Sequence, residues 1–332
     1  MNNGVQTSDN NQFSRVTIHL PDPTSDDVSA INCTHEPDAT TLAYVAASIA
    51  DSTRRAYRCD LEHFTAWGGV IPATDLQIAS YLATHAETLA VATLTRRLVS
   101  ISLAHRAKGY TSPTASELVR ATMRGIRRTH GVAQAQATPL LRDDLFQVLN
   151  HMGDRLKDVR DRALLLVGFA GGFRCSEVVS LDHGDLQVVR QGMIIHVRRS
   201  KTDQDAAGRK IGVPFGRTHY CPIRALDAWK TASAINEGPV FRPVDRHGKL
   251  AVCRLSPDAV SSIVRERVNA AGFDATGYSG HSLRAGLVTS AAQQGISSWK
   301  IRQQTGHASD AMMAKYVRDG ELFTQNVAGA LL

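Results

Sequence analysis

Two histidines, an arginine and a tyrosine lie close together near the carboxyl end of the chain. His281 and Arg284 are three residues apart at the start of an expected helix over 282–294, so their side chains share one face of its first turn. The N–H groups at a helix N-terminus also attract anions. His307 and Tyr316 follow. This set predicts a phosphate or carboxylate site, and one reaction that uses all four side chains is attack of a tyrosine on a phosphodiester.

A tyrosine nucleophile needs two kinds of help. Free tyrosine has a pKa near ~10, so Tyr316 needs neighbouring cations to lower that pKa. The alkoxide that leaves DNA is strongly basic, so the reaction also needs a general acid. Lys201, at the charged tip of an expected β-hairpin, reaches a site from outside, and Lys210 on the returning strand is the competing candidate. A core or surface tyrosine is the alternative interpretation of Tyr316.

Arg174 follows a Gly-Gly break and opens an expected helix. It has two interpretations of equal weight: an ion pair with Glu177, three residues on, or a bond to a phosphate. Arg284 favours the phosphate, because two guanidiniums can bracket the non-bridging oxygens of one phosphate.

The elements that position these residues are mainly helical. In the second half of the chain, helices are expected near 145–151, 161–170, 221–235 and 256–271. The alternating, β-branched segments 193–199 and 211–214 predict a hairpin around the tip SKTDQDAAGRK.

The first half of the chain predicts a helical domain over 39–130. Its helices are expected near 52–67 with Ser52 as the N-cap, at 74–85, through 91–101, and at 114–129. Arginines without acidic partners at helical spacing predict contact with a polyanion, with a solvated surface face as the alternative. The predicted DNA-binding residues are Arg96, Arg97, Arg120, Arg124, Arg127 and Arg128.

The composition of the chain limits the classes of function that it can have. With 332 residues, 43% hydrophobic and 21% charged, the chain is long enough for two globular domains. A net charge of +7 is compatible with DNA as partner. Five scattered cysteines predict reduced thiols in the cytoplasm. No signal pattern or apolar run of about 20 residues is present, so no membrane contact is expected. Residues 1–38 read as a flexible tail and 131–138 as a linker to a domain over 139–332.

Five boxes in order resemble the tyrosine recombinase (phage integrase) family. They are GGFRCSEVVSL at 171–181, the lysine in RRSKTDQ, HSLR at 281–284, TGH at 305–307 and KYVR at 315–318. The resemblance covers about 39–332, and the compact arrangement is similar to the Cre subgroup. It implies a C-shaped clamp of a helical, core-binding amino-terminal domain and an α+β catalytic domain.

The resemblance implies a role for each matching residue. Arg174, His281 and Arg284 would activate the scissile phosphate, with Lys201 as general acid and Tyr316 as nucleophile. His307 would bond the phosphate or support the tyrosine. Glu177 would support the site. The family reaction is site-specific strand exchange through a 3′-phosphotyrosyl intermediate and a Holliday junction, with neither metal nor ATP.

The resemblance also implies partners. They are double-stranded DNA with inverted-repeat sites, and three further copies of the chain in a tetramer on two sites, acting at the bacterial or phage nucleoid. The apolar stripe Phe323, Val327 and Leu331 in the segment 321–332 would dock into a neighbouring subunit, with burial in the same subunit as the alternative. Three other functions stay open: a type IB topoisomerase, a non-catalytic DNA-binding protein and a metal-dependent nuclease.

Overall fold

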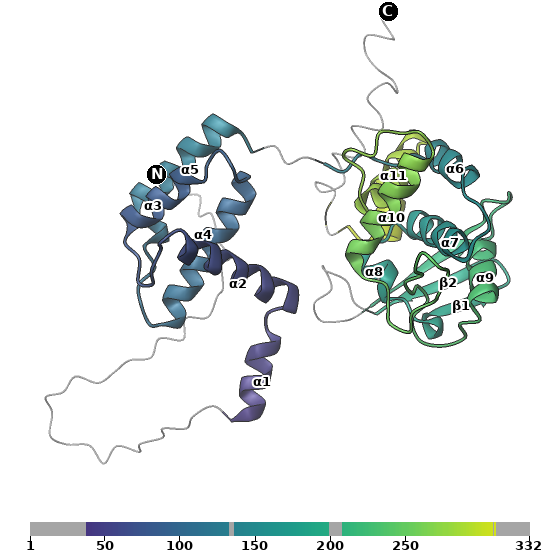
Figure 1. Ribbon diagram of the computed structural model, residues 1–332, viewed down its shortest axis with the longest axis horizontal. Coiled ribbons are helices and arrows are strands. Elements are labelled where there is room, and N and C mark those ends of the chain that lie inside the picture. The colour runs from purple at the N-terminus through teal and green to yellow at the C-terminus, as the bar shows by residue number, and fades with distance from the viewer. Residues whose placement is uncertain (1–37, 133–135, 199–207, 308, 310–332) are drawn as a thin grey trace, which may run out of the picture. The chain divides into compact units, whose positions relative to one another are not determined.

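The computed structural model describes residues 38–132, 136–198, 208–307 and 309 (Figure 1). The chain divides into two compact units, Met1–Val132 and Ala133–Leu332. The expected tail, apart from Asp38, lies outside the described residues, as do part of the linker, the tip of the predicted hairpin and the segment 321–332. None of the helices in the described ranges has the length and apolar composition to cross a bilayer.

The first unit is helical, as its sequence predicts. It contains α1 (Ala39–Ala47), α2 (Asp51–Ala66), α3 (Asp75–Thr84), α4 (Val91–Ala107), a 3₁₀ turn (Pro113–Ala115) and α5 (Glu117–His130). The predicted cap at Ser52 is wrong: α2 begins one residue earlier, at Asp51, and Ala50 occupies the N-cap position. An acidic first residue interacts favourably with the positive end of the helix dipole.

The core of the first unit forms where the apolar faces of these helices meet. Phe64 of α2, Tyr81 of α3 and Leu94 of α4 are fully buried, together with Val119 of α5. Burying a side chain of this size stabilises the fold by roughly 1.5–3 kcal/mol. Thr74 and Ser116 cap α3 and α5 by accepting hydrogen bonds from backbone N–H groups of their first turns.

The second unit combines a small antiparallel sheet with helices that pack beside it (Figure 1). Its strands are β1 (Leu186–Val189), β2 (Gly192–Val197) and β3 (Arg209–Pro214), in the order β1-β2-β3. Its helices are α6 (Arg142–Asn150), α7 (Leu156–Gly171), α8 (Cys175–Ser180), α9 (Pro222–Ser233), α10 (Pro257–Ala270), α11 (His281–Gln293) and α12 (Ser298–Thr305), with a 3₁₀ turn at His183–Asp185.

The predicted hairpin is confirmed as β2 and β3, and β1 was not expected. Ile195 and Ile211 are directly opposite each other and fully buried. Along β3 the alternation places Ile211 and Val213 in the core and Lys210 in solvent. Since side chains alternate between the two faces of a strand, Arg209 is on the inward-facing set with Ile211. β1 carries no comparable alternation, because its central residues are both exposed.

Candidate active site

Arg174 lies in a turn between two helices. α7 ends at Gly171, and its C-cap residue Gly172 has a φ of +57°, in the left-handed region that a glycine adopts without strain. Phe173 then turns into the core, 2% exposed, and Arg174 takes the N-cap position of α8. The sequence break at Gly171–Gly172 therefore places the Arg174 side chain beside the first turn of α8.

Glu177 holds that arginine by both its side chain and its backbone. Its carboxylate is buried, 1% exposed, and accepts from Arg174 Nη1 at 2.6 Å and from the Arg174 backbone N–H at 3.1 Å. Charge-assisted bonds of this kind are about twice as strong as neutral ones. The first interpretation of Arg174, an ion pair with Glu177, is therefore correct in the structure.

Arg284 is brought to the same place from α11. It is 5% exposed, and its Nη1 donates to the carbonyl of Gly172 at 2.7 Å and to that of Thr305 at 2.6 Å. The guanidinium therefore joins the end of α7, which precedes Arg174, to the end of α12. These two backbone carbonyls orient the guanidinium within the fold.

Arg209 is a third guanidinium in the cluster, and the sequence reading did not select it. Its Nη2 donates to Glu177 Oε2 at 2.9 Å, and its Nη1 to the Thr305 carbonyl at 2.6 Å. Burial lowers its pKa, as does the charge of Arg174, while Glu177 acts in the opposite direction. The available signal was the alternation of β3, which puts Arg209 on the inward-facing set with Ile211 and Val213.

His307 lies among these cations. It is 8% exposed, and burial together with the charges of Arg284, Arg174 and Arg209 lowers its pKa to about 3. Its Nδ1 is 2.7 Å from the Thr305 hydroxyl, which donates its one proton to the Ile301 carbonyl at 2.7 Å. The hydroxyl must then accept from Nδ1–H, so neutral His307 presents a lone pair at Nε2.

The remaining three predicted catalytic residues are His281, Lys201 and Tyr316. His281 is the first residue of α11 and is exposed. Lys201 and Tyr316 lie outside the described residues. Among the residues that are described, the structure brings together Arg174, Glu177, Arg284 and His307 and adds Arg209 and Thr305. Two guanidiniums share the Glu177 carboxylate and a third lies beside them, an arrangement able to neutralise a phosphate.

The arginines predicted to bind DNA divide into two groups. Those of α5, Arg120, Arg124, Arg127 and Arg128, are all exposed, and Arg124 pairs with Glu117. Those of α4 are engaged within the fold. Arg96 makes two hydrogen bonds to the buried carboxylate of Asp60, at 2.8 and 2.9 Å, and keeps 47% of its side chain exposed.

The prediction for Arg97 is wrong. Its side chain is 9% exposed, and its Nη1 bonds to the Tyr81 hydroxyl and the His63 ring, each at 2.7 Å. The guanidinium is thus committed to a polar network between α2, α3 and α4. Helical spacing placed Arg97 beside Arg96 on the polar side, but one residue of rotation is enough to turn it into the interior.

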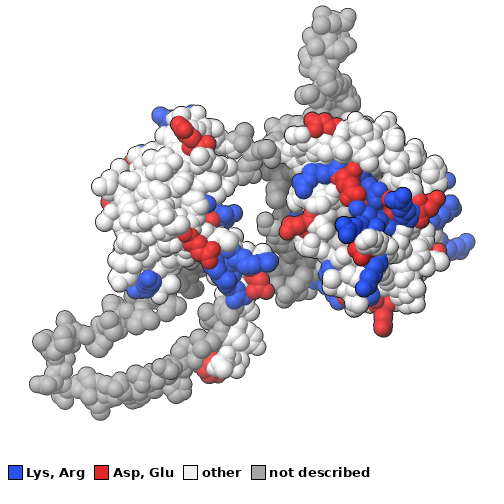
Figure 2. All heavy atoms as spheres, in the orientation of Figure 1, with Lys and Arg blue, Asp and Glu red and all other residues white. Residues whose placement is uncertain are grey.

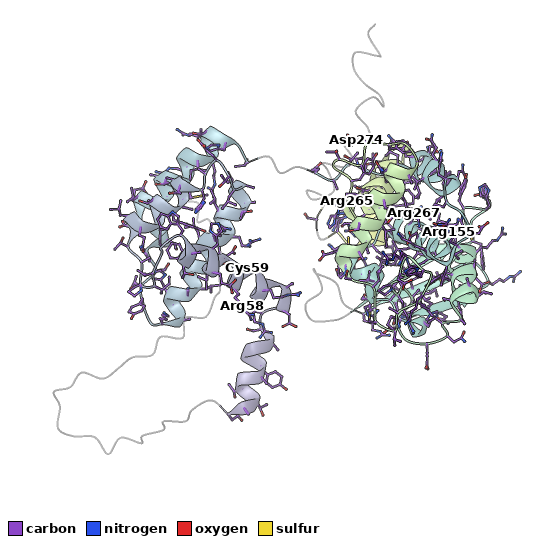
Figure 3. The ribbon with its side chains drawn as sticks, viewed as in Figure 1. Arg58, Cys59, Arg155, Arg265, Arg267 and Asp274 are labelled. Atoms are coloured by element: carbon purple, nitrogen blue, oxygen red, sulfur yellow. The ribbon has the colours of Figure 1, made fainter. Side chains whose placement is uncertain are left out.

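A basic face on α2 was missed. Figure 2 shows lysine and arginine side chains gathered over this helix, where Figure 3 labels Arg58 next to Cys59. Arg54, Arg55 and Arg58 are exposed there. Their spacing over one helical turn was visible in the sequence. We therefore count α2, with α5, among the surfaces able to meet a polyanion.

The basic side chains on the second unit are mixed with acidic ones in the same view (Figure 2). Arg267 of α10, labelled in Figure 3, pairs with Asp158 and Asp161 at 2.6 Å each. These bonds fasten α10 to α7, so that part of the charge stabilises the fold.

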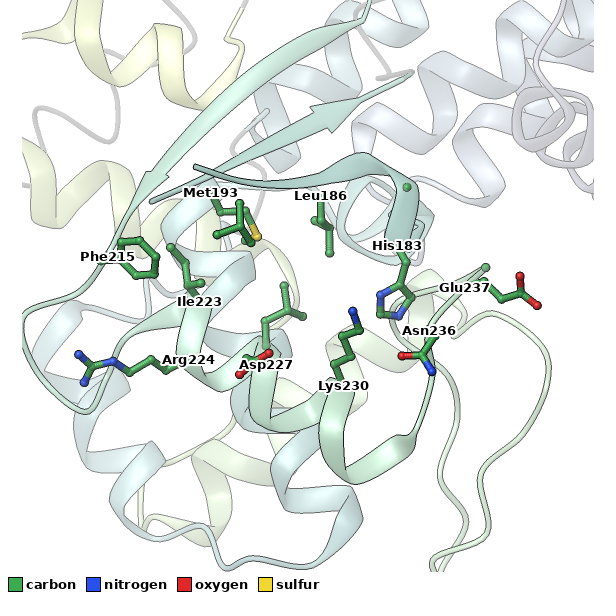
Figure 4. A pocket seen from close by; sticks show the side chains of 14 residues that line it. His183, Leu186, Met193, Phe215, Ile223, Arg224, Asp227, Lys230, Asn236 and Glu237 are labelled. Atoms are coloured by element: carbon green, nitrogen blue, oxygen red, sulfur yellow. The ribbon is translucent and has the colours of Figure 1, made fainter. Parts of the chain in front are cut away.

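Of two cavities in the second unit, one lies beside the arginine cluster and the other lies between the sheet and α9. One, of about 410 Å³, is lined by Trp299, Arg302, Gln303 and His307, so it opens beside the cluster. The other, of about 680 Å³, lies between the sheet and α9, with Leu186, Met193 and Lys230 in its wall (Figure 4). Of the predicted catalytic residues that the structure describes, none lines this larger cavity, so the arginine cluster is the candidate active site.

Comparison with known proteins points to one family. The sequence model of the phage integrase family matches residues 139–321. The chain is 38% identical to an integrase/recombinase xerD homolog from Selenomonas ruminantium over 289 residues, 84% of this chain and 85% of that protein. It is 28% identical to the Cre recombinase of Escherichia phage P1 over 268 residues, 75% of this chain and 77% of that protein.

Solved structures show the same fold. Lambda integrase, as a dimer bound to a COC′ core site, is 18% identical with a TM-score of 0.60, over 84% of this chain and 92% of that chain. Its tetramer bound to a Holliday junction gives a TM-score of 0.56 at 18% identity, over 83% of this chain and 75% of that chain.

Proposed function

The chain belongs to the phage integrase family of tyrosine recombinases, which are site-specific DNA recombinases, and we propose that Tyr316 is the nucleophile of its strand-transfer reaction. The observation that carries this proposal is the convergence of Arg174, Arg284 and His307. These residues come from three separate segments: Arg174 pairs with the buried Glu177, Arg284 bonds to the Thr305 carbonyl, and the charges of both arginines act on His307. An excess of positive charge in a partly buried site favours the doubly charged transition state of phosphoryl transfer.

The reaction balances without an external reagent. The Tyr316 oxygen attacks the scissile phosphorus and its proton passes to solvent, the bond to the 5′ oxygen breaks, and a 3′-phosphotyrosyl bond forms. The leaving 5′ oxygen takes a proton from Lys201. The 5′ hydroxyl of a partner strand then reverses these steps, so the energy of the phosphodiester is conserved.

Each described residue has a role in this scheme. Arg174 and Arg284 bind the non-bridging oxygens, and Glu177 orients Arg174. His281, exposed at the first turn of α11, donates to the same phosphate. His307 presents Nε2 as an acceptor while it is neutral, which suits support of the tyrosine hydroxyl. A nearby phosphate raises its pKa and turns Nε2 into a donor.

Lys201 is the better candidate for the general acid, because the side chain of its competitor, Lys210, points away from the arginine cluster. Lys210 is exposed on β3, directly after Arg209, whose guanidinium bonds to Glu177. Successive side chains of a strand point to opposite faces, so Lys210 points away from the arginine cluster.

Besides the scissile phosphate bound at the arginine cluster of the second unit, DNA contacts are proposed for the first unit. On the first unit, α5 supplies Arg120, Arg124, Arg127 and Arg128, and α2 supplies Arg54, Arg55 and Arg58. These exposed guanidiniums suit phosphate contacts, which position a protein on the duplex. The recognised DNA is proposed to be a pair of inverted-repeat sites, and the protein to act in the cytoplasm, where DNA is accessible.

Assembly as a tetramer on two sites is proposed on the analogy of the lambda integrase tetramer on a Holliday junction. The segment 321–332, with its stripe Phe323, Val327 and Leu331, is proposed to dock into a neighbouring subunit. Deleting 321–332 is expected to abolish cooperative binding and synapsis while single-site binding persists. Intact synapsis after the deletion contradicts the docking.

Strand exchange can be tested directly once the protein's own target DNA has been identified by covalent trapping. Nicked fragments of its own genome are incubated with the enzyme, and covalently trapped fragments are sequenced to give the probe, called site DNA below. Two copies of site DNA on one supercoiled plasmid should yield deletion or inversion products. Relaxation of a one-site plasmid without any recombinant product from the two-site plasmid identifies a topoisomerase instead.

A further inference from the structure

Arg209 lies at the junction of the bonds that fix the two phosphate-binding arginines. It shares the Glu177 carboxylate with Arg174: Nη2 of Arg209 is 2.9 Å from Oε2, and Nη1 of Arg174 is 2.6 Å from Oε1. It shares the Thr305 carbonyl with Arg284, each through Nη1 at 2.6 Å. One side chain is therefore bonded to an acceptor of each of the other two guanidiniums.

The backbone around Thr305 is shaped to admit this side chain. Gly306 follows Thr305 with φ of +67°, and a Cβ at position 306 would stand 1.5 Å from Arg209 Nη1. The Thr305 hydroxyl accepts from His307. The turn that carries His307 thus closes over the Arg209 guanidinium, which fixes both the turn and the carbonyl that holds Arg284.

The position of Arg209 in the chain links this junction to the hairpin. It is the first residue of β3 and pairs with Val197, the last residue of β2. The connection between these strands contains Lys201. Since Arg209 ties the base of the hairpin to Glu177 and Thr305, it holds together the segments that bear the proposed general acid and the two arginines.

Arg209 is itself poorly placed to bind the phosphate. Both terminal nitrogens already donate to protein acceptors, and Nε is shielded from solvent with no hydrogen-bond partner among the described residues. Arg209 adds a positive charge next to the site without presenting a fork of N–H groups to a substrate. Its action therefore passes through Arg174, Arg284 and the turn at Thr305.

On the basis of the proposed strand-transfer function, we propose that Arg209 is a positioning residue that sets the spacing of Arg174 and Arg284 for the scissile phosphate. Without it, Glu177 pairs with Arg174 alone, and the Thr305 carbonyl loses one of its two guanidinium donors. The defect should appear in the chemical step, because the DNA-contacting surfaces of α2 and α5 belong to the other unit.

The test compares Arg209→Ala and Arg209→Lys with wild type in single-turnover cleavage of nicked site DNA at saturating protein. Arg209→Ala should cleave up to about 100-fold more slowly, as when catalytic groups are misplaced by about 1 Å, with binding of site DNA changed less than about 2-fold. Arg209→Lys should be intermediate, because one ammonium keeps the charge but lacks the fork that serves two acceptors.

A second substrate separates positioning from a general loss of structure. A methylphosphonate at the scissile position carries no negative charge, so it depends less on correctly spaced cations. The deficit of Arg209→Ala relative to wild type should shrink to less than about 3-fold on this substrate. Arg198→Ala is the matched control, since Arg198 is an exposed arginine at the end of β2 that pairs with Asp182 and Asp185 instead.

Each possible result either supports or contradicts the positioning role of Arg209. Wild-type cleavage rates for Arg209→Ala, or an equal deficit on both substrates, overturn the positioning role. If wild type itself forms no Tyr316-dependent adduct, the strand-transfer function fails, and this outcome is distinct from the first two. Melting temperatures of the variants, measured beside wild type, show whether a lost rate reflects unfolding.

Discussion

Arg284 donates through Nη1 to the backbone carbonyl of Thr305 at 2.6 Å. This bond joins α11, which presents the HSLR box, to the end of α12, where the TGH box begins. Two boxes that are separate in the sequence thereby become one rigid edge of the arginine cluster.

Gly306 is predicted to tolerate no side chain. In Gly306→Ala the new Cβ would overlap Arg209 Nη1, so the guanidinium must leave Glu177 and Thr305. We expect cleavage of site DNA to fall by at least about 10-fold, the loss expected for a displaced stabilising cation. Gly295→Ala is the matched control: its φ is +69° and nothing lies within 4 Å of its Cβ, so it reports backbone strain alone. Equal effects of both substitutions on the rate contradict this prediction.

His307 is predicted to make stability fall in acid. An unfolded histidine has a pKa near 6.5, whereas that of folded His307 is about 3. Above pH 6.5 both states are neutral and stability is independent of this group. Between about 6.5 and 3 the unfolded state binds a proton that the folded state does not, so the free energy of unfolding decreases by up to about 1.4 kcal/mol per pH unit.

Urea unfolding between pH 7 and pH 4 measures this dependence. His307→Gln should show a shallower loss of stability than wild type over that range. The control is His219→Gln, which removes an exposed histidine from the same unit and should follow wild type. A His307→Gln curve parallel to that of wild type would show that the imidazole is protonated in the folded protein.

The general acid is predicted to be Lys201. Lys201→Ala should slow cleavage of site DNA by about 100- to 10,000-fold, because the 5′ alkoxide then leaves without a proton. A sulfur in the bridging 5′ position gives a thiolate, a much weaker base that needs no acid, so this substrate should restore the rate to near that of wild type. Lys210→Ala should cleave both substrates like wild type. Rescue of Lys210→Ala instead would transfer the role to Lys210.

An exposed arginine of the first unit is predicted to contribute to DNA binding, and a buried one to the stability of the fold. Arg127→Ala should lower the slope of log binding constant against log salt concentration by about 1, the value for one lost phosphate contact. Arg97→Ala should leave that slope unchanged and destabilise the fold by about 1–3 kcal/mol, as expected when buried hydrogen-bonding groups lose their partner. Measured salt titrations and urea unfolding of both variants check this. An altered slope for Arg97→Ala would return it to the DNA surface.

The sequence was most informative where a single local rule sets the structure. His281 and Arg284 fall on one helical turn, and Gly171–Gly172 ends a helix, so these features follow from spacing and glycine content. The bond between Arg284 and Thr305 could not be foreseen, because it depends on how two helices pack. Arg209 was missed because the reading of the hairpin considered lysines as acids and passed over an arginine on the inward-facing set of β3.

Arg97 illustrates the opposite error. Both Arg96 and Arg97 are polar, so the helical period places them on the same side, but the partners that decide burial come from other helices. Asp60 lies on α2 and Tyr81 on α3. A buried charge requires such partners, and only the tertiary structure supplies them. β1 escaped notice for a related reason: a four-residue strand with an exposed centre has no hydrophobic period.

The central claim is that the Tyr316 oxygen carries the DNA strand during exchange, and trapping of the covalent intermediate tests it most directly. Wild type incubated with nicked site DNA, whose cleaved fragment diffuses away, should give a denaturation-resistant adduct at the 3′ phosphate, in EDTA as well as in magnesium. Tyr316→Phe should bind the same DNA with the same affinity and give no adduct. An undiminished adduct from Tyr316→Phe, or a free 3′ phosphate with wild type, would contradict the account.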